Sequence, residues 1–341
     1  MSIITIINSR RSMIRCFCAV VLAALAAVAC VSPGARPKGF VGVHGRLRVS
    51  GNKIVDKNGK PIALHGMSLY CWNQQGGAFY NASAITHFAQ DWKCTVIRIA
   101  ILPRAYQTNP TNEMNRVKTV VDACISNGIY AIIDWHSMQG AQNNIPLAQK
   151  FFTEVATAYG KTPNIMYEPW NEPVQEAWPV IKAYHEAVIA KIRAVDPENI
   201  IICGSRHWDQ ECAEASANPI TDFKNIAYSI HFYAATHRQS LRNNGATALK
   251  NGVALFATEY GTSSASGGGA YDPKESQLWW DWLDENSIGC ANWSAAPLGE
   301  TSAAFKPGTT PTGPWTDDML KPSGLLVRNY VMSKYPSAAG K

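Results

Sequence analysis

The chain has 341 residues, of which 46% are apolar and 16% charged, and its formal net charge is +6. This composition is typical of a globular protein and excludes an intrinsically disordered chain. Without the leader described next, which holds three Arg and no acidic residue, the net charge is +3 (31 − 3 − 25). So small an excess of positive charge gives no reason to expect a nucleic-acid partner.

Residues 1–30 have the pattern of an export signal. Arg10, Arg11 and Arg15 come before an apolar run of 15 residues that ends in small side chains, CFCAVVLAALAAVAC. A membrane anchor is the alternative, but this run is short for a span of about 20 residues. Cys30, which follows AVA, would also allow lipid attachment. We therefore predict a secreted protein, extracellular or periplasmic, whose folded domain covers residues 36–337.

Six cysteines remain after the leader, and none forms a CxxC pair. A zinc site is therefore not expected, and we predict no metal and no other cofactor. An oxidising compartment permits disulfides, but six cysteines allow fifteen pairings, and plain buried thiols are the alternative. Cys203 and Cys212 flank the stretch GSRHWDQE, so a bridge between them is a hypothesis that rests on proximity alone. The six residues are Cys71, Cys94, Cys124, Cys203, Cys212 and Cys290.

The predicted elements begin with a β-hairpin over residues 46–66, with Asn58 and Gly59 at its turn. Eight apolar, strand-like runs follow, and helical patterns such as 113–128 and 174–197 lie between most of them. Eight β units with interleaved helices over about 290 residues predict an α/β fold, the (β/α)8 TIM barrel. The runs are 63–69, 95–101, 130–136, 164–170, 199–204, 226–233, 253–261 and 288–293.

A doubly wound open sheet is the alternative fold, but no GxGxxG motif follows the first strand. The one low-complexity stretch is SSASGGGA, residues 263–270, which is typical of a mobile loop. The sequence shows no linker and no second domain. We therefore expect a monomer that needs no protein partner.

Polar and aromatic side chains gather at the ends of the predicted strands. In a (β/α)8 barrel the active site is built there, at the C-terminal ends of the strands. A single such residue is more often a cap or a hydrogen-bonded core residue, but a series of them on strand after strand predicts a functional site. These residues are Arg98, His136, Asn171 with Glu172, Trp208, His231 with Tyr233, Glu259 and Trp293.

Two carboxylates, Glu172 and Glu259, facing each other across a cleft with tryptophan platforms would fit glycoside hydrolysis. One Glu must be protonated to give its proton to the leaving oxygen, and the other must be ionised to attack the anomeric carbon. Their surroundings must therefore push the two pKa values apart. Arg98 and Tyr233 could hydrogen-bond the ionised Glu and hold its pKa low, and His231 could position the acid.

Two neighbours of Glu172 have separate predicted tasks. Asn171 could bond the 2-hydroxyl of a sugar, an interaction that strengthens in the transition state. Glu168 lies four residues before Glu172, deeper in the predicted strand, and we expect it to hold a structural hydrogen bond instead.

Other chemistries fit the sequence less well. The stretch YHEAVI is not HExxH, which disfavours a zinc protease. GSRHW and GTSSA both lack the last glycine of GxSxG, so a serine esterase would have no nucleophile elbow. No phosphate-binding Walker motif is present.

The sequence resembles glycoside hydrolase family 5 and, within it, the bacterial-type endo-β-1,4-glucanases, or cellulases. The motifs run in order from GKPIALHGMS through VIRIAI, AIIDWH, IMYEPWNEP, SIHFY, FATEYGT and NWS to FKPGTTPTGPW, and they cover nearly all of the chain after the leader. The resemblance implies a retaining hydrolase on a (β/α)8 barrel, with Glu172 as the acid/base and Glu259 as the nucleophile. It also implies a surrounding site of Arg98, His136, Asn171, His231, Tyr233 and Trp293, with Trp208 as a sugar platform beyond the cleavage point.

The sequence departs from this family pattern in two places. Tyr70 follows GMSL, where many relatives have His, and a tyrosine can still stack on a sugar. After NW, relatives often carry an Asp-Lys pair, whereas this chain has SAAPLGE with Pro297 and Leu298, although Glu300 remains. The expected partner is a β-glucan such as cellulose. The alternatives are a mannanase or mixed-linkage β-glucanase on the same fold, and a non-catalytic carbohydrate-binding surface protein.

Overall fold

The structure is a computed structural model that describes residues 39–72 and 77–335, all within one compact unit. The predicted export signal, Cys30 and the outermost residues of the predicted domain 36–337 lie outside the described residues. Among the helices that are described, none has the length and apolar character needed to cross a membrane.

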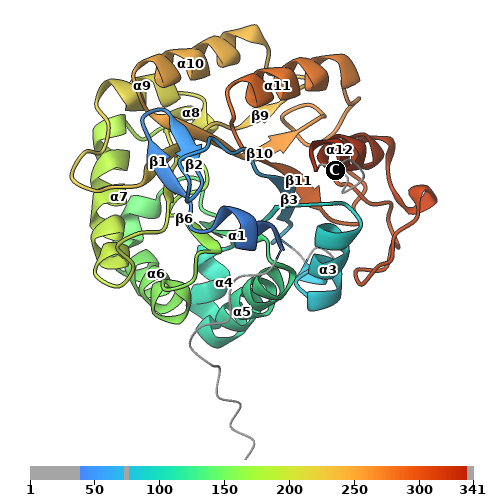
Figure 1. Ribbon diagram of the computed structural model, residues 1–341, viewed down its shortest axis with the longest axis horizontal. Helices are drawn as coiled ribbons and strands as arrows, with labels where there is room; N and C mark the ends of the chain where they lie inside the picture. Colours follow the sequence, from blue (N-terminus) through green and yellow to red (C-terminus); the bar gives the residue numbers. More distant parts are fainter. Residues whose placement is uncertain (1–38, 73–76, 336–341) are drawn as a thin grey trace, which may run out of the picture. The chain divides into compact units, whose positions relative to one another are not determined.

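Eight parallel strands form a closed barrel surrounded by helices, which confirms the predicted fold (Figure 1). The barrel strands pair in chain order, and the pairings of β11 with β10 and with β3 close the ring. A further two-residue strand, β9, pairs with the end of β10. The strands are β1 (Arg48–Ser50), β2 (Lys53–Val55), β3 (His65–Leu69), β4 (Val96–Ile101), β5 (Tyr130–Trp135), β6 (Ile165–Glu168), β7 (Ile201–Cys203), β8 (Ile226–Ser229), β9 (Phe232–Tyr233), β10 (Ala254–Gly261) and β11 (Cys290–Ala295).

The helices alternate with the strands along the chain and cover the outside of the barrel (Figure 1). In α5, Asn109 caps the N-terminus, Pro110 opens the first turn, and Gly128 follows the last turn with a φ of 66°, the left-handed conformation that suits a C-cap. The helices are α1 (Gly39–His44), α3 (Ala82–Gln90), α4 (Pro103–Thr108), α5 (Pro110–Asn127), η1 (Ala141–Asn144), α6 (Ile145–Tyr159), α7 (Trp178–Arg193), α8 (Arg206–Asp209), α9 (Cys212–Ala217), α10 (Gln239–Lys250), α11 (Pro273–Glu285), η2 (Asp317–Met319) and α12 (Pro322–Lys334).

The β1–β2 hairpin is present, but its predicted turn was wrong. The turn between the two strands contains Gly51, whose φ of 57° favours glycine. Asn58 and Gly59 lie in the next turn, which closes only an isolated bridge between Val55 and Pro61. Two backbone hydrogen bonds flank this bridge, from the Asp56 N–H to the Lys60 carbonyl at 2.9 Å and from the Ile62 N–H to the Ile54 carbonyl at 3.0 Å.

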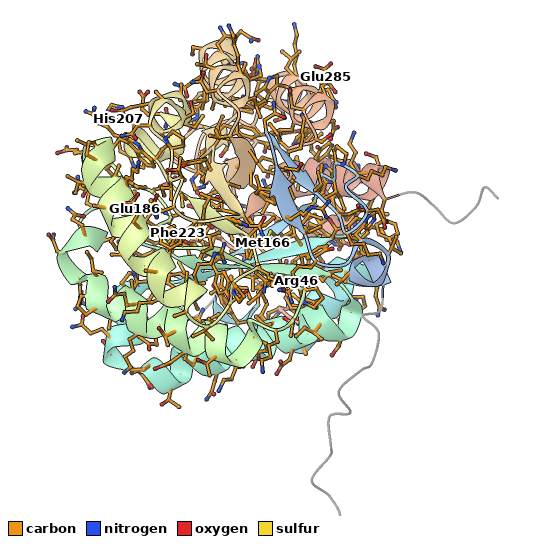
Figure 2. The ribbon with its side chains drawn as sticks, turned by 60° about the vertical axis from the view of Figure 1, so that its left-hand side comes forward. Arg46, Met166, Glu186, His207, Phe223 and Glu285 are labelled. Atoms are coloured by element: carbon orange, nitrogen blue, oxygen red, sulfur yellow. The ribbon has the colours of Figure 1, made fainter. Side chains whose placement is uncertain are left out.

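The hairpin and α1 close the N-terminal end of the barrel. Ile54 of β2 and Val41 of α1 pack with Ile132 and Met166, which point inward from β5 and β6. Figure 2 shows Met166 in the interior and Glu285, at the end of α11, on the outside. Since this end is filled with apolar side chains, a polar site can form only towards the opposite end of the strands.

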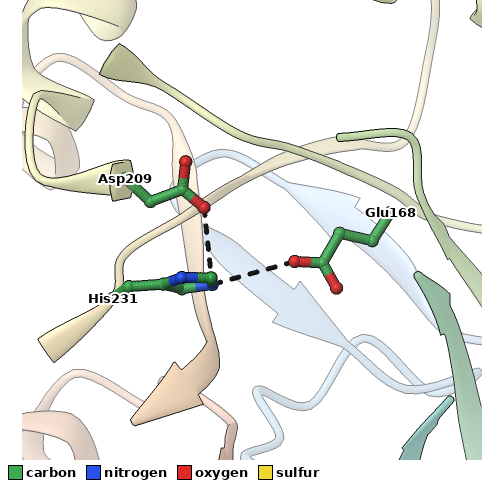
Figure 3. Close-up of side chains that lie close together, drawn as sticks. All are labelled: Glu168, Asp209 and His231. Atoms are coloured by element: carbon green, nitrogen blue, oxygen red, sulfur yellow. Dashed lines mark ion pairs between the residues drawn. The ribbon is translucent and has the colours of Figure 1, made fainter. Parts of the chain in front are cut away.

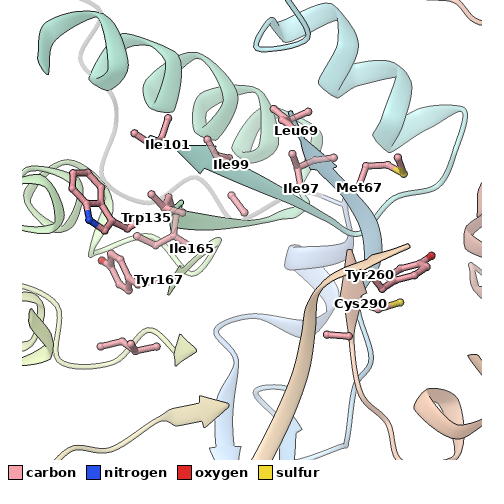
Figure 4. Close-up of a cluster of buried hydrophobic side chains, with 14 of the residues drawn as sticks. Met67, Leu69, Ile97, Ile99, Ile101, Trp135, Ile165, Tyr167, Tyr260 and Cys290 are labelled. Carbon is pink, nitrogen blue, oxygen red and sulfur yellow. The ribbon is translucent and has the colours of Figure 1, made fainter. Parts of the chain in front are cut away.

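The outward faces of the same strands form the larger core, between the barrel and its helices. Met67, Ile97 and Ile99 belong to this core, and Figure 4 shows them with Trp135 among the strands near the helices. Inward and outward residues alternate because successive side chains of a strand point to opposite faces. This second core holds the strands that carry the site.

The hypothesis of a bridge between Cys203 and Cys212 was wrong, since all six cysteines are free and buried. Cys203 ends β7 and packs in the core between barrel and helices. Cys212 begins α9, and its Sγ lies 3.2 Å from Asn244 Oδ1. Burial raises the pKa of both thiols, which keeps them protonated.

Candidate active site

Arg98 lies at the centre of the site. It points inward from β4, is fully buried, and its guanidinium contacts three carboxylates. Nε and Nη2 donate to the two oxygens of Glu168 at 2.7 and 3.1 Å, and Nη1 donates to Glu259 at 2.9 Å. Nη2 also lies 2.9 Å from Asp134 Oδ2. The rigid fork of one guanidinium thus fixes groups from β5, β6 and β10 relative to one another.

Glu168, the last residue of β6, has the structural hydrogen bonds that we expected. Besides the two bonds from Arg98, Oε1 accepts a hydrogen bond from the Thr258 hydroxyl at 2.7 Å. Burial alone would raise its pKa, but Arg98 and His231 lower the pKa of Glu168 to about 2. Glu168 is therefore ionised and fully bonded, with no free oxygen for a substrate.

Glu259 lies near the end of β10 and faces the cleft. Oε2 accepts a hydrogen bond from Arg98, and Oε1 accepts one from the Tyr233 hydroxyl at 2.7 Å. Burial would raise its pKa, but Arg98, the two nearby imidazoles and the Tyr233 hydrogen bond together hold the pKa of Glu259 below its ordinary value. A buried carboxylate that is kept ionised in this way is suited to nucleophilic attack.

Glu172 lies in the segment that follows β6, and backbone hydrogen bonds fasten this segment to the end of β5. The Asn171 N–H donates to the Trp135 carbonyl at 3.1 Å, and the Glu172 N–H donates to the Ser137 carbonyl at 3.0 Å. The described residues offer the Glu172 side chain one hydrogen-bond partner, His231 Nδ1, at 2.9 Å from Oε1. Its other oxygen is thus open to the cleft.

The carboxylates of Glu172 and Glu259 face each other. One oxygen of each and a ring nitrogen of His231 all lie within 4.8 Å of one another. Retaining glycosidases hold their two carboxyl groups about 5–5.5 Å apart, whereas inverting enzymes need about 6.5–9.5 Å to admit a water. The observed separation fits the retaining geometry.

Asn171 lies beside this pair and is itself held by Arg98. Its Oδ1 accepts a hydrogen bond from Arg98 Nη2. Because Arg98 can only donate, the amide nitrogen of Asn171 must point the other way, and it has no partner among the described residues. This nitrogen is a free donor next to Glu172.

The cleft has two lobes of about 430 Å³ each, and the lobes meet at the carboxylate pair. Both lobes are lined by Met138, Glu172, Tyr233, Glu259 and Ala265. One lobe adds Trp208, Gln210, His231 and His237. The other adds Tyr70, Trp72, His136, Ser266, Gly267, Trp293, Glu300 and Ser302.

Flat aromatic surfaces lie in both lobes. The rings of His136 and Trp293 are stacked, with centroids 5.0 Å apart and an interplanar angle of 2°, and Tyr70 lies 5.4 Å from Trp293. In the other lobe Trp208 is 41% exposed, which is unusual for so large an apolar side chain. Such faces can stack on sugar rings. The structure thus brings all the predicted site residues together, while their individual roles stay predictions.

Thr258 is a site residue that the sequence analysis missed. It donates to Glu168 and lies 2.8 Å from His231 Nε2. Strand alternation would place it on the opposite face from its neighbour Glu259. The register of β10 against β11 shifts after Ala257, and this irregularity lets both side chains reach the site.

Asp209 was missed as well. Its Oδ2 lies 3.4 Å from His231 Nε2, and Figure 3 shows the imidazole between Asp209 and Glu168. The only sequence signal was its position directly after Trp208, and nothing in the local pattern distinguishes such an Asp from a turn residue.

Within the part of the chain that the structure describes, two groups of side chains have ligand atoms close enough to surround a cation. They are Glu168, Asp209 and His231, and Glu172, His231 and Glu259. Arg98 already neutralises Glu168 and Glu259, and its positive charge would repel a second cation. The donors therefore fit proton transfer better than metal binding.

Residues 55–299 match the family described as Cellulase (glycosyl hydrolase family 5). Endoglucanase Z of Dickeya dadantii is 41% identical over 300 residues, which are 86% of this chain and 68% of that relative. Endoglucanase A of Evansella cellulosilytica is 43% identical over 280 residues, or 80% of this chain and 57% of that relative. The chain thus spans 57–68% of the length of these two curated relatives.

Solved structures share the fold over most of their length. A protein of Cytophaga hutchinsonii has a TM-score of 0.85 and 48% identity, with 87% of this chain and 97% of that one covered. The catalytic domain of the Thermobifida fusca endoglucanase Cel5A has a TM-score of 0.81 and 33% identity, with 85% and 98% covered. A variant of that T. fusca domain has been solved in complex with cellotetraose.

Proposed function

This chain belongs to glycosyl hydrolase family 5, the cellulase family, and we propose that it is an endoglucanase that hydrolyses internal β-1,4-glucosidic bonds of cellulose and related β-glucans. One observation carries the proposal: oxygens of Glu172 and Glu259 approach within 4.8 Å at the place where the two lobes of the cleft meet. A cleft that continues on both sides of the reacting pair can hold a polymer by its middle, as endo-action requires.

In the first step Glu259 attacks the anomeric carbon while Glu172 gives its proton to the leaving glycosidic oxygen. The bond from the anomeric carbon to that oxygen breaks as the bond to Glu259 forms, which produces a covalent glycosyl-enzyme. Arg98 and Tyr233 prepare Glu259 for this attack because both donate hydrogen bonds to its ionised form.

In the second step Glu172, now ionised, takes a proton from a water molecule that attacks the anomeric carbon and releases Glu259. Two inversions at the same carbon give net retention. His231, at 2.9 Å from Glu172, holds the side chain in place for both steps. The free amide nitrogen of Asn171 is placed to donate to the sugar 2-hydroxyl, where the bond strengthens in the transition state.

The cleft suits a β-glucan chain as the partner. Trp208 offers a sugar platform in one lobe, and Tyr70 and Trp293 offer one in the other. Glu300 is a further acidic group of this second lobe besides the carboxylate pair, and burial raises its pKa. Because Leu298 stands where relatives often have lysine, we expect weaker polar contacts to a distal sugar there.

Secretion and a monomeric state are also part of the proposal. Secretion is supported by the charged and apolar pattern of residues 1–30. The monomer is supported by a site whose groups all come from one chain. Fractionation of the producing cells and sedimentation of the purified protein test these two points, and a stable dimer or an intracellular pool would contradict them.

Assays on carboxymethylcellulose, lichenan, mannan and xylan test the activity. We expect a rapid fall in the viscosity of carboxymethylcellulose, because internal cuts shorten chains faster than end-wise cuts. Proton NMR during hydrolysis of a short cello-oligosaccharide should show the β-anomer first. Activity on mannan alone, or initial release of the α-anomer, would refute the proposal.

A further inference from the structure

Asp209 is a buried carboxylate beside His231 that the proposed mechanism does not use. It has no exposed surface, and Oδ1 accepts a hydrogen bond from the Ser205 N–H at 2.7 Å. Oδ2 has no hydrogen-bond partner among the described residues and lies 3.4 Å from His231 Nε2 (Figure 3). One oxygen thus fastens the local backbone, and the other is directed at the imidazole.

The backbone that carries Asp209 is held in an unfavourable conformation. His207, Trp208 and Asp209 have φ values of 54°, 56° and 61°, so three successive residues with side chains are left-handed. The His207 and Trp208 N–H groups donate to the carbonyls of Val174 and Pro173 at 3.2 and 2.9 Å, directly after the proposed acid in the chain. Strained backbone of this kind persists only where its surroundings hold it, and it is often found at functional sites.

This turn also contacts His231 through the backbone. The His231 N–H donates to the Asp209 carbonyl at 3.4 Å, so Asp209 contacts His231 twice. The turn exposes Trp208 to the cleft and directs the neighbouring Asp209 side chain inward. One strained turn therefore places both a sugar platform and a charge behind the imidazole.

The hydrogen bonds around His231 determine where its protons lie. Glu168 is ionised and can only accept, so the Thr258 hydroxyl donates to it. Thr258 must then accept a hydrogen bond from His231 Nε2, at 2.8 Å, and Nε2 carries a proton. The one remaining proton is shared between His231 Nδ1 and Glu172 Oε1, which are 2.9 Å apart.

We propose that Asp209 is a positioning residue that acts through His231 to keep this shared proton on the Glu172–His231 pair, and so sets the alkaline limit of activity. The proposal rests on the proposed role of Glu172 as the acid. Burial raises the pKa of Asp209 well above its ordinary value, and His231 opposes this rise. At a pH where Asp209 is ionised, its negative charge beside Nε2 favours every state in which the linked pair retains the proton. Loss of that charge should let the proton leave at a lower pH.

The charged groups around the imidazole come from several elements. Burial alone disfavours the imidazolium, but Asp209, ahead of Glu168 and Glu172, raises the pKa of His231 above its ordinary value. The carboxylates facing the ring are Glu168 and Glu172 from β6 and the segment after it, Asp209 from α8 and Glu259 from β10. Asp209 is the one member of this set with a fully buried oxygen that makes no hydrogen bond among the described residues.

Asp209→Asn is the decisive variant. Asparagine keeps the size and can still accept from the Ser205 N–H, but it removes the charge. We expect the alkaline limb of kcat/KM for a soluble cello-oligosaccharide to move down by about one pH unit, with a smaller change in the acid limb. An alkaline limb that stays in place, or an equal loss of activity at every pH, would overturn the proposal.

Asp196→Asn is the matched control. Asp196 is also fully buried and caps backbone N–H groups, those of Glu198 and Asn199, but it contacts no site residue. The pH profile of Asp196→Asn should stay that of the wild type.

A dinitrophenyl cellobioside gives a second control, because its leaving group needs no proton. Its alkaline kcat/KM should not respond to Asp209→Asn, and a response would contradict an effect on the acid.

Nitrogen-15 NMR of the histidine rings tests the effect of Asp209 on the protonation of His231 without any turnover. The His231 signals, assigned by comparison with His231→Gln, should titrate at lower pH in Asp209→Asn than in the wild type. If the wild type hydrolyses no glucan but this shift is seen, the proposed function is wrong, and the effect of Asp209 on the His231 titration is confirmed. If the wild type is active and the His231 titration is unmoved, only the Asp209 proposal fails.

Discussion

The lower and upper layers of the barrel interior come from the same strands and have opposite chemistry. Residues two apart in a strand share a face, about 6.6 Å from each other. Over that distance the interior changes from apolar side chains to a network of charges around one arginine. The pairs are Val96 and Arg98 in β4, Ile132 and Asp134 in β5, Met166 and Glu168 in β6, and Phe256 and Thr258 in β10.

The two layers contribute differently to the stability and to the function of the barrel. The lower layer, closed by the hairpin, removes apolar surface from water and so stabilises the fold. The upper layer buries charges, which is costly unless each is paired and hydrogen-bonded. Changes in the lower layer should therefore act on stability with little effect on activity, whereas changes in the upper layer should act on catalysis and on how activity and stability depend on pH.

Glu259→Ala should have the largest effect. It removes the proposed nucleophile, so turnover should fall by about 10⁴-fold or more on every substrate, activated aryl glycosides included. The far-UV spectrum and the melting temperature should show that the barrel remains folded. With azide added, the product should be the α-glycosyl azide, and a β-azide would mean that the two glutamates have been assigned the wrong way round.

Glu172→Ala should come next, with a selective loss. Hydrolysis of cello-oligosaccharides should fall by about 10²–10⁴-fold, because a sugar leaving group needs a proton. The first step on a dinitrophenyl cellobioside should largely survive, and azide should restore turnover as the β-glycosyl azide, since azide needs no base. Undiminished cleavage of cellulose by this variant would exclude Glu172 as the acid.

Ile54→Ala tests the lower layer. Ile54 is buried where the hairpin closes the barrel, so its truncation should lower the free energy of unfolding by about 2–5 kcal/mol. Denaturant titration measures this loss. At 25 °C kcat/KM should match the wild type, because the carboxylate pair lies at the other end of the strands. A large loss of activity in the folded protein would show that the two layers are not independent.

Glu168→Gln tests the structural charges of the upper layer. The pKa of Glu168 is about 2 against an ordinary value of 4.5, so its ionisation contributes about 3 kcal/mol of stability (2.5 pH units) above pH 4.5. Because the folded pKa is the lower one, this contribution disappears as the pH falls from 4.5 towards 2. The wild type and Glu168→Gln should therefore differ at pH 7 and converge near pH 2. A difference that is constant with pH would point to packing instead of charge.

Much of the fold followed from local sequence patterns. Apolar runs alternate with amphipathic helices, and eight such units close into a barrel, so the ends of the strands could be located before any contact was known. The predictions of the hairpin turn and of the cysteine bridge were wrong for the same reason: the local sequence does not decide between equally suitable partners. Gly51 and Asn58-Gly59 are both good turn sequences, and closeness of Cys203 and Cys212 along the chain says nothing of their directions.

Short motifs and the periodicity of each segment were enough to predict the family, the order of the strands and the pair of glutamates that face each other in the cleft. The motifs also predicted most of the groups around this pair, but Thr258 and Asp209 were found only in the folded structure. Thr258 lies 90 residues from Glu168 in the chain, and the strand irregularity after Ala257 lets both Thr258 and its neighbour Glu259 reach the site. Asp209 reaches His231 through a turn whose left-handed backbone conformation is unfavourable for residues with side chains. Contacts of this kind arise from the closure of the whole barrel, which no local pattern encodes.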